Sequence, residues 1–414
     1  MIRIEAARLI PGRGEPIQNG CVVMENTKVI YAGPTANAPS TPKAVVTEAK
    51  VVMPGLWDCH AHLFGMTRPD LSVLVSDSIA VAAARSVKDL ERALNGGVTT
   101  IREVGGLGVY LSRVIADGTV QGPNIYGAGA VLSMTGGHAD IHAFPLDVLH
   151  VAEGASSLLA LCDGVPSCLH QVRRQLRQGA RLIKVCASGG VMSEIDHPIH
   201  QQFSDEELSA IVGEAARAER IVAAHCHGKP GIMAALRAGV KTIEHGTYLD
   251  EEAAELMVRC GAVLVPTRFV VENLLGMRGS MPDYAFQKAA AIGERHAEAM
   301  KIAVHHGVKI AAGTDIFVSG PALWGRNGLE ASYLVKAGMT PLQAIEAATA
   351  NGPATLGGQA PKSGILAAGN DADVITLDAD PLEDISILGN PERVVGVWKA
   401  GVRVKNVANL APFH

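Results

Sequence analysis

Short apolar segments separated by longer helical patterns run through the middle of this 414-residue chain. Each segment has the length and composition of a buried strand, and each is followed by a stretch with helical periodicity. Eight strands that alternate with helices are the number needed to close a parallel (β/α)8 barrel, also called a TIM barrel. We therefore expect an α/β fold built around such a barrel. The eight predicted strands span residues 51–60, 98–104, 124–132, 181–188, 221–227, 241–245, 262–267 and 308–315.

Two of the predicted helices have clear start signals. Ser204 is followed three residues later by Glu207, the pattern of a capping box, which predicts a helix that runs to Arg220. A second helix is predicted to begin at Thr340, because a proline then occupies the favoured first helical position. The stretch over residues 133–178 carries few such signals, and we expect an insertion or a lid there.

The two ends of the chain have a different sequence pattern from its middle. Both alternate short apolar runs with Gly, Pro, Asn and Asp, as expected of β-hairpins. Strands from the two ends can pair in one small β domain that flanks the middle of the chain. We therefore predict a small β-sandwich domain formed by residues 1–52 and 360–414, and a barrel domain formed by residues 53–359.

The composition argues against several classes of partner. The formal net charge is -5 and no run of Lys or Arg occurs, so neither nucleic acid nor an anionic membrane is expected. No stretch of about 20 apolar residues is present, and the N-terminal segment lacks the pattern of a signal peptide. The seven cysteines are scattered without a CxxC motif, which favours a reducing compartment. We expect a cytoplasmic protein that acts on a small molecule, although a signal peptide removed beforehand would leave no trace.

Polar residues gather at the carboxyl ends of the predicted strands. In a parallel barrel these ends meet on one face, which is where active sites are built. Five different strands therefore direct reactive side chains toward one cavity. These residues are His60, His62, Lys184, His225, His227, His245 and Asp315.

The pair His60 and His62 suggests a metal site. Residues two apart on a strand project to the same face, so both imidazoles can reach one metal ion. Two ordinary histidines near a turn would give the same motif. Asp315 follows the last strand and offers a hard oxygen ligand or a general base. The Gly-Thr-Asp ending is common in loops, however, so neither motif decides the chemistry alone.

Lys184 stands out because it lies inside an apolar strand, where burying an unpaired ammonium group is costly. A lysine that snorkels to the surface or forms a salt bridge is the alternative. His225 and His245 end neighbouring strands, and a single histidine in such a place is more often structural. Two of them on consecutive strands, beside the first histidine pair and the terminal aspartate, favour metal binding instead.

Five motifs together resemble the binuclear metal-dependent amidohydrolase superfamily over essentially the whole chain. Within it, the sequence looks closest to ochratoxinase and to the Xaa-Pro dipeptidase-like carboxypeptidases, which it also resembles in LSMTGGHAD and DGTVQGPN. The resemblance implies a hydrolase that cleaves the amide C–N bond of N-acyl amino acids, dipeptides or ochratoxin A-type amides. The motifs are PGLWDCHAH, IKVCASGGVMS, AHCHGKPGIMAA, TIEHGTYLDEE and AAGTD.

The resemblance also implies two divalent metal ions. CO2 would convert Lys184 into a carbamate that bridges them, and this turns an unpaired buried cation into an anion neutralised by two dications. The donor types accept zinc, cobalt, manganese or iron, and we expect zinc and a homo-oligomeric protein. The ligands would be His60, His62 and Asp315 for one ion, and His225 and His245 for the other.

A water shared by two metal ions has a pKa low enough to give hydroxide near neutral pH. Asp315 would orient this hydroxide, accept its proton and pass the proton to the leaving amine. By resemblance, His227 and His138 would contact the carbonyl oxygen or the oxyanion. A place behind the metal ligands or in a lid is the alternative for both.

A free carboxylate on the substrate would need a cation to receive it. Arg268, at the end of the seventh predicted strand, is the first candidate and Lys229 is the second. Both could equally be surface charges that balance Asp and Glu. The loop Met192–Phe203 is expected to rim the pocket, with His197 and His200 as solvated or lid residues.

Other functions share parts of this pattern. Cyclic amides, phenylureas or carbamates could be cleaved by the same metal core, because loops rather than the fold set the substrate. A deaminase of the same superfamily typically lacks the lysine and carries a glutamate near the fifth-strand histidine, where this chain has Lys229 and Pro230. An inactive scaffold would lack ligands, and here every position is filled.

Overall fold

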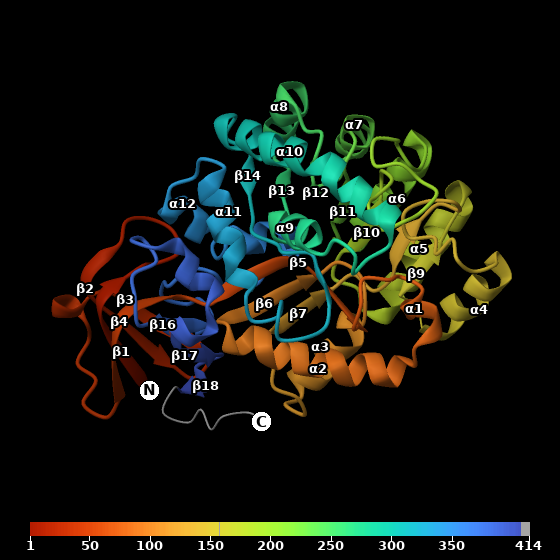
Figure 1. Cartoon of the computed structure of the whole chain (residues 1–414). Helices are drawn as coiled ribbons and strands as arrows, with labels where there is room; N and C mark the ends of the chain where they lie inside the picture. The colour runs from red at the N-terminus through yellow and green to blue at the C-terminus, as the bar shows by residue number, and fades with distance from the viewer. Residues whose placement is uncertain (157, 407–414) are drawn as a thin grey trace.

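A computed structural model describes residues 1–156 and 158–406 of the chain. Parallel strands surrounded by helices form a barrel, and a separate β-sheet built from both ends of the chain lies at one side of it (Figure 1). The predicted α/β class, with a (β/α)8 barrel and a small β domain, is confirmed.

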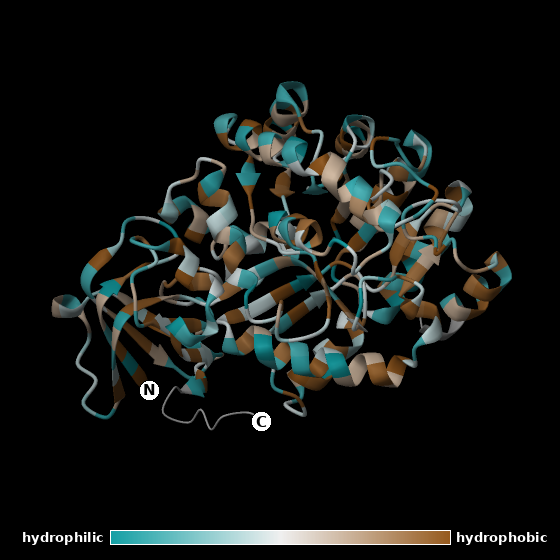
Figure 2. Cartoon of the chain, in the orientation of Figure 1, coloured by the Kyte–Doolittle hydropathy of each residue, from teal (hydrophilic) through white to brown (hydrophobic). Residues whose placement is uncertain are grey.

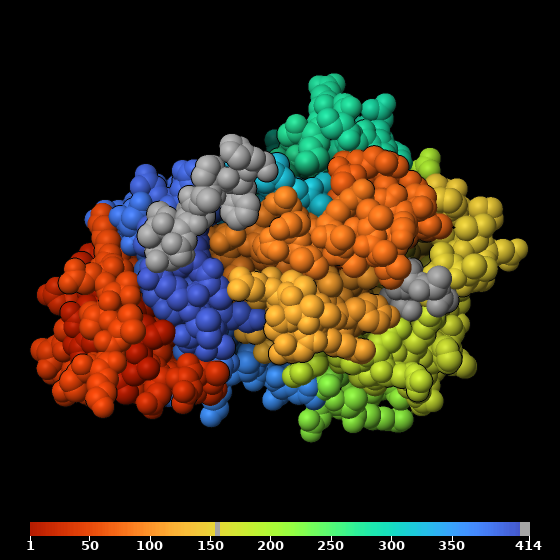
Figure 3. Space-filling view, turned by 90° about the horizontal axis from the view of Figure 1, so that it is seen from below, coloured from red at the N-terminus to blue at the C-terminus, as the bar shows by residue number. Residues whose placement is uncertain are grey.

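The small β domain contains one seven-stranded sheet that joins the two ends of the chain. In spatial order its strands are β18 (Val402–Asn406), β17 (Val394–Lys399), β16 (Val374–Leu377), β4 (Val45–Pro54), β1 (Ile2–Leu9), β2 (Ile17–Glu25) and β3 (Lys28–Pro34). The C-terminal strands join the sheet where β16 pairs antiparallel with β4. Figure 3 shows the same arrangement on the surface, with red N-terminal residues beside blue C-terminal ones. Both ends of the chain therefore depend on one hydrogen-bonded sheet.

The barrel strands follow the predicted order, but two of the predicted strands are divided. The chain passes from β4 to the first barrel strand at Gly55, where an added Cβ would lie 2.2 Å from the Thr99 hydroxyl oxygen. The predicted strand 124–132 is also split in two. The barrel strands are β5 (Leu56–Met66), β6 (Val98–Glu103), β7 (Asn124–Gly127), β8 (Val131–Ser133), β10 (Ile183–Cys186), β11 (Val222–Cys226), β12 (Thr242–His245), β13 (Val263–Val265) and β14 (Lys309–Ile310).

The barrel closes where its last strand meets its first. The amide of Cys59 in β5 donates a hydrogen bond to the carbonyl of Ala312, 2.9 Å away, just after β14. The short strand β15 (Ile316–Val318), which the sequence did not predict, then pairs parallel with the end of β5. Elsewhere the amide of Arg181 donates to the carbonyl of Gly127 over 2.8 Å, which connects β7 to the segment before β10.

Helices cover the outside of the barrel. Figure 2 shows hydrophobic and hydrophilic residues mixed along the helices that surround the barrel. Both predicted helix starts are confirmed: Ser204 forms a capping box with Glu207, and Thr340 caps the last helix. No helix of the described residues is long and apolar enough to cross a membrane. The helices are α1 (Val73–Ser76), α2 (Ile79–Asn95), α3 (Gly108–Ala116), α4 (Leu146–Ser156), α5 (Gly164–Gln178), α6 (Asp205–Arg217), α7 (Lys229–Ala238), α8 (Glu251–Cys260), α9 (Arg268–Gly276), α10 (Asp283–His305), α11 (Glu330–Lys336) and α12 (Pro341–Ala347).

Residues 133–178 contain more regular structure than their sequence signals predict. This stretch forms α4, a short strand β9 (Leu159–Leu161) beside β8, and α5. Helix α5 packs against α6, so it belongs to the outer layer of the barrel rather than to a lid. The buried side of α5 carries Cys168 and Val172 together with the polar Gln171 and Gln175.

Candidate active site

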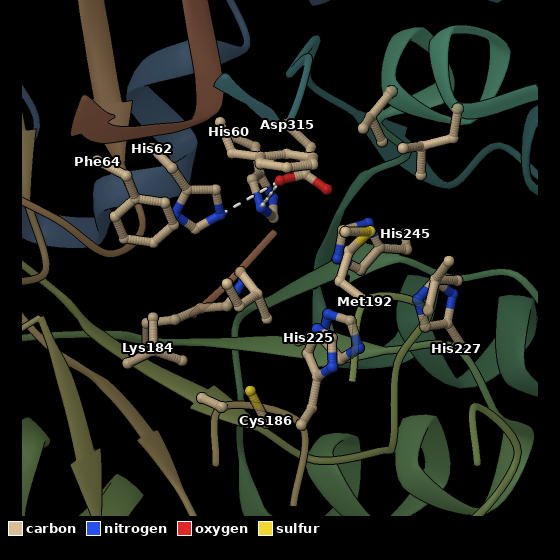
Figure 4. A pocket seen from close by; sticks show the side chains of 18 of the residues that line it. His60, His62, Phe64, Lys184, Cys186, Met192, His225, His227, His245 and Asp315 are labelled. Atoms are coloured by element: carbon tan, nitrogen blue, oxygen red, sulfur yellow. Dashed lines mark ion pairs between the residues drawn. The ribbon is translucent and has the colours of Figure 1, made fainter. Parts of the chain in front are cut away.

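Three predicted metal ligands meet at the carboxyl-terminal face of the barrel, and they come from its first strand and from the segment after its last strand. His60 and His62 lie on β5, and Asp315 follows β14. The Nε2 atoms of His60 and His62 lie 3.3 and 3.2 Å from Oδ1 of Asp315, as the dashed lines in Figure 4 mark. One donor atom from each residue lies within 4.8 Å of the others, a spacing that suits one metal ion.

The close approach of the last strand to β5 sets this geometry. The amide of Asp315 donates to the carbonyl of His60 over 2.6 Å. Gly313 permits the contact, because a Cβ there would lie 2.8 Å from the Cβ of His60. Asp315 itself has a φ of 57°, a left-handed conformation that residues other than glycine seldom adopt. Backbone strain of this kind concentrates at functional sites.

His225, His227 and His245 form a second group of donors, again within 4.8 Å of one another. The parallel register of β11 and β12 pairs His245 with Cys226. Cys226 lies between His225 and His227 in the sequence, so His245 comes close to both. His245 has a φ of 69°, so a second donor also lies in the left-handed region. The sequence predicted His225 and His245 as ligands and His227 as a substrate contact, and the structure brings all three together.

Hydrogen bonds behind the first group orient its imidazoles. Nδ1 of His60 donates to a carboxylate oxygen of Glu244 over 2.7 Å. Nδ1 of His62 donates to the carbonyl of Gly105 over 2.8 Å. Each ring is therefore protonated at Nδ1, which leaves the Nε2 lone pair for a metal ion.

The second group is oriented in a similar way. Nδ1 of His245 lies 2.7 Å from the hydroxyl oxygen of Thr267, which donates its own proton to the carbonyl of Pro266, so the imidazole is the donor. His225 uses the other nitrogen: its Nε2 donates to the carbonyl of Gly189 over 3.1 Å, which leaves Nδ1 for a metal ion. Four rings thus each keep one unprotonated nitrogen, the form that binds metals.

Burial favours the same protonation states. It lowers the pKa of His227 to about 3, and it holds the pKa values of His225 and His245 well below the usual range. Burial opposes ionisation of Asp315, but the contacts with His60 outweigh this effect and keep its pKa well below normal. Neutral imidazoles and an ionised carboxylate are a donor set that fits divalent metal ions.

A buried ion pair fixes the carboxylate behind His60. Nη2 of Arg102 donates to both carboxylate oxygens of Glu244, at 2.8 and 2.7 Å, and both side chains are fully buried. Arg102 also donates to the carbonyl of Cys59 and to the hydroxyl of Thr242. Burial opposes ionisation of Glu244, but Arg102 and then His60 hold its pKa below the usual range. His60 therefore faces an ionised acceptor, which makes its Nε2 a better metal ligand.

Lys184 extends from β10 into the cavity that both groups share (Figure 4). The residue is only 2% exposed, and no hydrogen bond or ion pair joins its amine to another residue that the structure describes. Burial lowers the pKa of this amine, and the carboxylate of Glu244 opposes the shift only in part. A buried amine without a partner suits conversion to a carbamate, because the neutral amine is the form that reacts with CO2.

The donors lie at the base of a cavity of about 930 Å³, its open mouth included. Apart from the two donor groups, His138 and Lys184, its described lining residues are apolar or cysteine, and Lys184 is the single lysine or arginine among them. A cavity with a few convergent polar groups and apolar walls is the usual form of a small-molecule site. Large apolar side chains that line it include Phe64, Leu74, Leu159, Met192, Leu274 and Phe317.

Comparison with known proteins agrees with this geometry. The model of the amidohydrolase family matches residues 51–404. The chain belongs to the amidohydrolase family. It is 42% identical to ochratoxinase of Aspergillus niger over 96% of this chain and 85% of that protein. The protein is accordingly a hydrolase that acts on carbon–nitrogen bonds, in a family that generally uses divalent metals.

Solved structures of related amidohydrolases extend the comparison. The crystal structure of A. niger ochratoxinase is similar with a TM-score of 0.92, covering 98% of this chain and 95% of that one. A prolidase complexed with N-methylphosphonate-L-proline has a TM-score of 0.88 at 31% identity, with 98% and 99% covered. A Xaa-Pro dipeptidase with bound methionine has a TM-score of 0.86 at 30% identity, with 98% and 100% covered. These neighbours support metal-dependent amide hydrolysis.

The two cations predicted to receive a substrate carboxylate lie outside the amidohydrolase cavity. Arg268 begins α9, and its guanidinium group donates to the carbonyl of Gly293 over 2.6 Å and pairs with Glu272. Lys229 begins α7 and pairs with Asp250 over 2.6 Å. The sequence located both residues near strand ends, but the carboxylates and carbonyls that hold their side chains come from elements distant in the chain.

The remaining residues predicted for the amidohydrolase site lie either in the cavity lining or outside it. His138 follows β8 and lines the cavity, with its ring stacked on that of His225 at a centroid distance of 4.2 Å. The loop after β10 contributes Met192 to the cavity wall, as expected for a rim. His197 and His200 in the same loop are exposed and lie outside the cavity lining.

Several residues that support the amidohydrolase site were not predicted. Arg102 and Glu244 are charged residues inside apolar strands, which is the same signal that identified Lys184. Asp58, next to the histidine motif on β5, accepts hydrogen bonds from the hydroxyl of Thr314 and the amide of Asn327, at 2.5 and 2.7 Å. No local pattern predicts these contacts, because their partners lie more than 250 residues away.

Proposed function

We propose that this amidohydrolase is a metallopeptidase-like enzyme that cleaves the amide bond of N-acyl amino acids or dipeptides with bulky apolar groups. The observation that carries the proposal is the placement of two groups of metal donors and Lys184 in one apolar cavity. The likeness to ochratoxinase, to the prolidase and to the Xaa-Pro dipeptidase supports an amide as the substrate.

We propose that the site holds two zinc ions and a carbamate on Lys184. His60, His62 and Asp315 would hold one ion, and His225 and His245 would hold the other. The carbamate forms when the amine nitrogen of Lys184 bonds to the carbon of CO2 and releases one proton. Bound metal ions supply a water of lowered pKa and polarise the scissile carbonyl.

The chain's own residues then have separate tasks. Asp315 accepts the proton of the attacking water and passes it to the leaving amine nitrogen, a role that suits a carboxylate held ionised by His60 and His62. His227 and His138 line the cavity and contact polar atoms of the substrate. The apolar walls exclude water from the reacting atoms, which strengthens each of these interactions.

The cavity lining bears on the substrate. Because Arg268 and Lys229 are engaged elsewhere, a substrate carboxylate would be received by imidazoles or metal ions rather than by a guanidinium group. The same feature favours a second candidate, hydrolysis of an uncharged phenylurea, cyclic amide or carbamate, since such a molecule needs no cation. The apolar walls suit either class.

A hydrolysis screen on enzyme of measured metal content tests the proposal. The panel pairs N-acyl amino acids and dipeptides with their neutral carboxamide counterparts, and adds ochratoxin-type aryl amides and phenylureas. We expect turnover of acids that carry aromatic or large aliphatic groups. Turnover of neutral substrates with no cleavage of any carboxylate-bearing amide would refute the peptidase assignment and leave the second candidate.

A further inference from the structure

His138 is held on several sides at once. Its ring stacks on His225, with 23° between the ring planes, and its backbone amide donates to the side-chain oxygen of Gln202 over 3.0 Å. On another side the backbone of Gly190 lies so close that an added Cβ would be 2.1 Å from Nδ1 of His138. The imidazole therefore has little freedom to rotate.

A chain of two hydrogen bonds defines which ring nitrogen of His138 carries the proton. Nδ1 lies 2.8 Å from the hydroxyl oxygen of Ser193. That hydroxyl donates its single proton to a carboxylate oxygen of Asp196. Ser193 must then accept the hydrogen bond from Nδ1, so the neutral ring is protonated at Nδ1.

Asp196 is itself fixed from three directions. Its other carboxylate oxygen accepts hydrogen bonds from the amide of Gly190 and from the side chain of Gln202, both at 3.0 Å. The amine of Lys288, on α10, donates to the backbone carbonyls of Ser193 and Asp196 at 2.7 and 2.5 Å. Helix α10 thus anchors the loop after β10, and this loop orients His138.

We propose that Ser193, Asp196 and Lys288 are positioning residues that hold His138 as the Nδ1-protonated tautomer. Nε2 then carries a lone pair, and no other residue that the structure describes forms a hydrogen bond with it. The chain of hydrogen bonds therefore fixes the orientation of the ring that lines the cavity. The expected effect on catalysis rests on the proposed function, whereas the tautomer of His138 follows from the hydrogen bonds alone.

The first test needs no substrate. In the metal-loaded enzyme labelled with 15N-histidine, the signals lost in His138→Gln identify this ring. We expect 15N shifts of the Nδ1-protonated tautomer in the wild type, and movement toward the other tautomer in Ser193→Ala. A wild-type ring protonated at Nε2 overturns the proposal. This result stands even if no amide is cleaved, so the two proposals fail separately.

The second test measures kinetics on the best amide of the screen. We expect Asp196→Asn and Ser193→Ala to lower kcat/KM by roughly 10- to 100-fold with unchanged metal content, the size typical of contacts that orient a functional residue. In a His138→Ala background the same changes should have no further effect. Asp205→Asn, an exposed aspartate after the same loop, is the matched control and should keep full activity. Additive losses in the His138→Ala background would show a merely structural role and overturn the proposal.

Discussion

Replacing Arg102 with methionine would leave the Glu244 carboxylate buried without its counter-charge. Both side chains are fully buried and are joined by hydrogen bonds of 2.8 and 2.7 Å. Removing one partner of such a pair costs about 3–5 kcal/mol of folding free energy. The variant also loses the hydrogen bonds that Arg102 donates to Cys59 and Thr242, which places the expected loss in the upper part of this range.

The consequence for the metal centre is separate from the consequence for stability. Glu244 accepts the hydrogen bond from His60, and loss of such a contact typically weakens metal binding by roughly 10- to 100-fold. Unfolding in urea, followed by circular dichroism, measures the first effect, and competition with a chelator measures the second. The double variant Arg102→Met/Glu244→Leu should regain much of the stability, since apolar residues can replace a buried pair, but not the metal affinity.

Arg259→Met is the matched control. Arg259 pairs with Glu255 on the surface over 3.6 Å, and both side chains are largely exposed. An exposed pair of this kind contributes roughly 0–1 kcal/mol. If Arg102→Met unfolded at the same urea concentration as this control, the buried pair would not have the role inferred from its geometry.

Three further outcomes are expected. Lys184→Ala and Asp315→Asn should each abolish turnover while circular dichroism shows an intact fold, and normal rates in either variant would contradict the two-metal site. Chelation should remove activity, and added zinc, cobalt or manganese should restore it in proportion to the metal bound; full activity at zero metal would contradict the assignment. Burial raises the pKa of Glu103 to about 8, above its usual 4.5, so the folded state favours the protonated form and this contribution to stability should fall as pH rises from about 4.5 to 8. The melting temperature of Glu103→Gln, compared with the wild type across this range, should lack that component of the pH dependence, and identical profiles would show that Glu103 is not the group responsible.

The sequence predicted the barrel because burial of strands and helices has a local periodic signal. The capping box at Ser204 is equally local, and the structure shows it unchanged. The division at Gly55 was not predicted, since the apolar run continues through it and the change of sheet depends on which distant strands pair on each side. Helix α5 was not predicted, and its buried side carries two glutamines beside Cys168 and Val172.

The candidate site also divides into features that local sequence patterns predict and features that depend on distant residues. The donors were predictable since each occupies a strand end, and parallel strands bring those ends to one face. The directions in which the side chains of Arg268 and Lys229 point could not be predicted, because they depend on carboxylates and carbonyls that other elements supply. The support of His138 was also beyond local patterns, since it requires a lysine from α10, about 150 residues further along the chain.

The hydrogen bonds between β5 and the segment after β14 have a consequence for assembly. His60 comes from the first barrel strand and Asp315 from the end of the last, so this donor group lies across the seam where the barrel closes. An unclosed barrel has no such donor group, and a metal ion held there would join the two edges of the seam. Loading of such an ion and completion of the fold would then be one linked equilibrium, in which each favours the other.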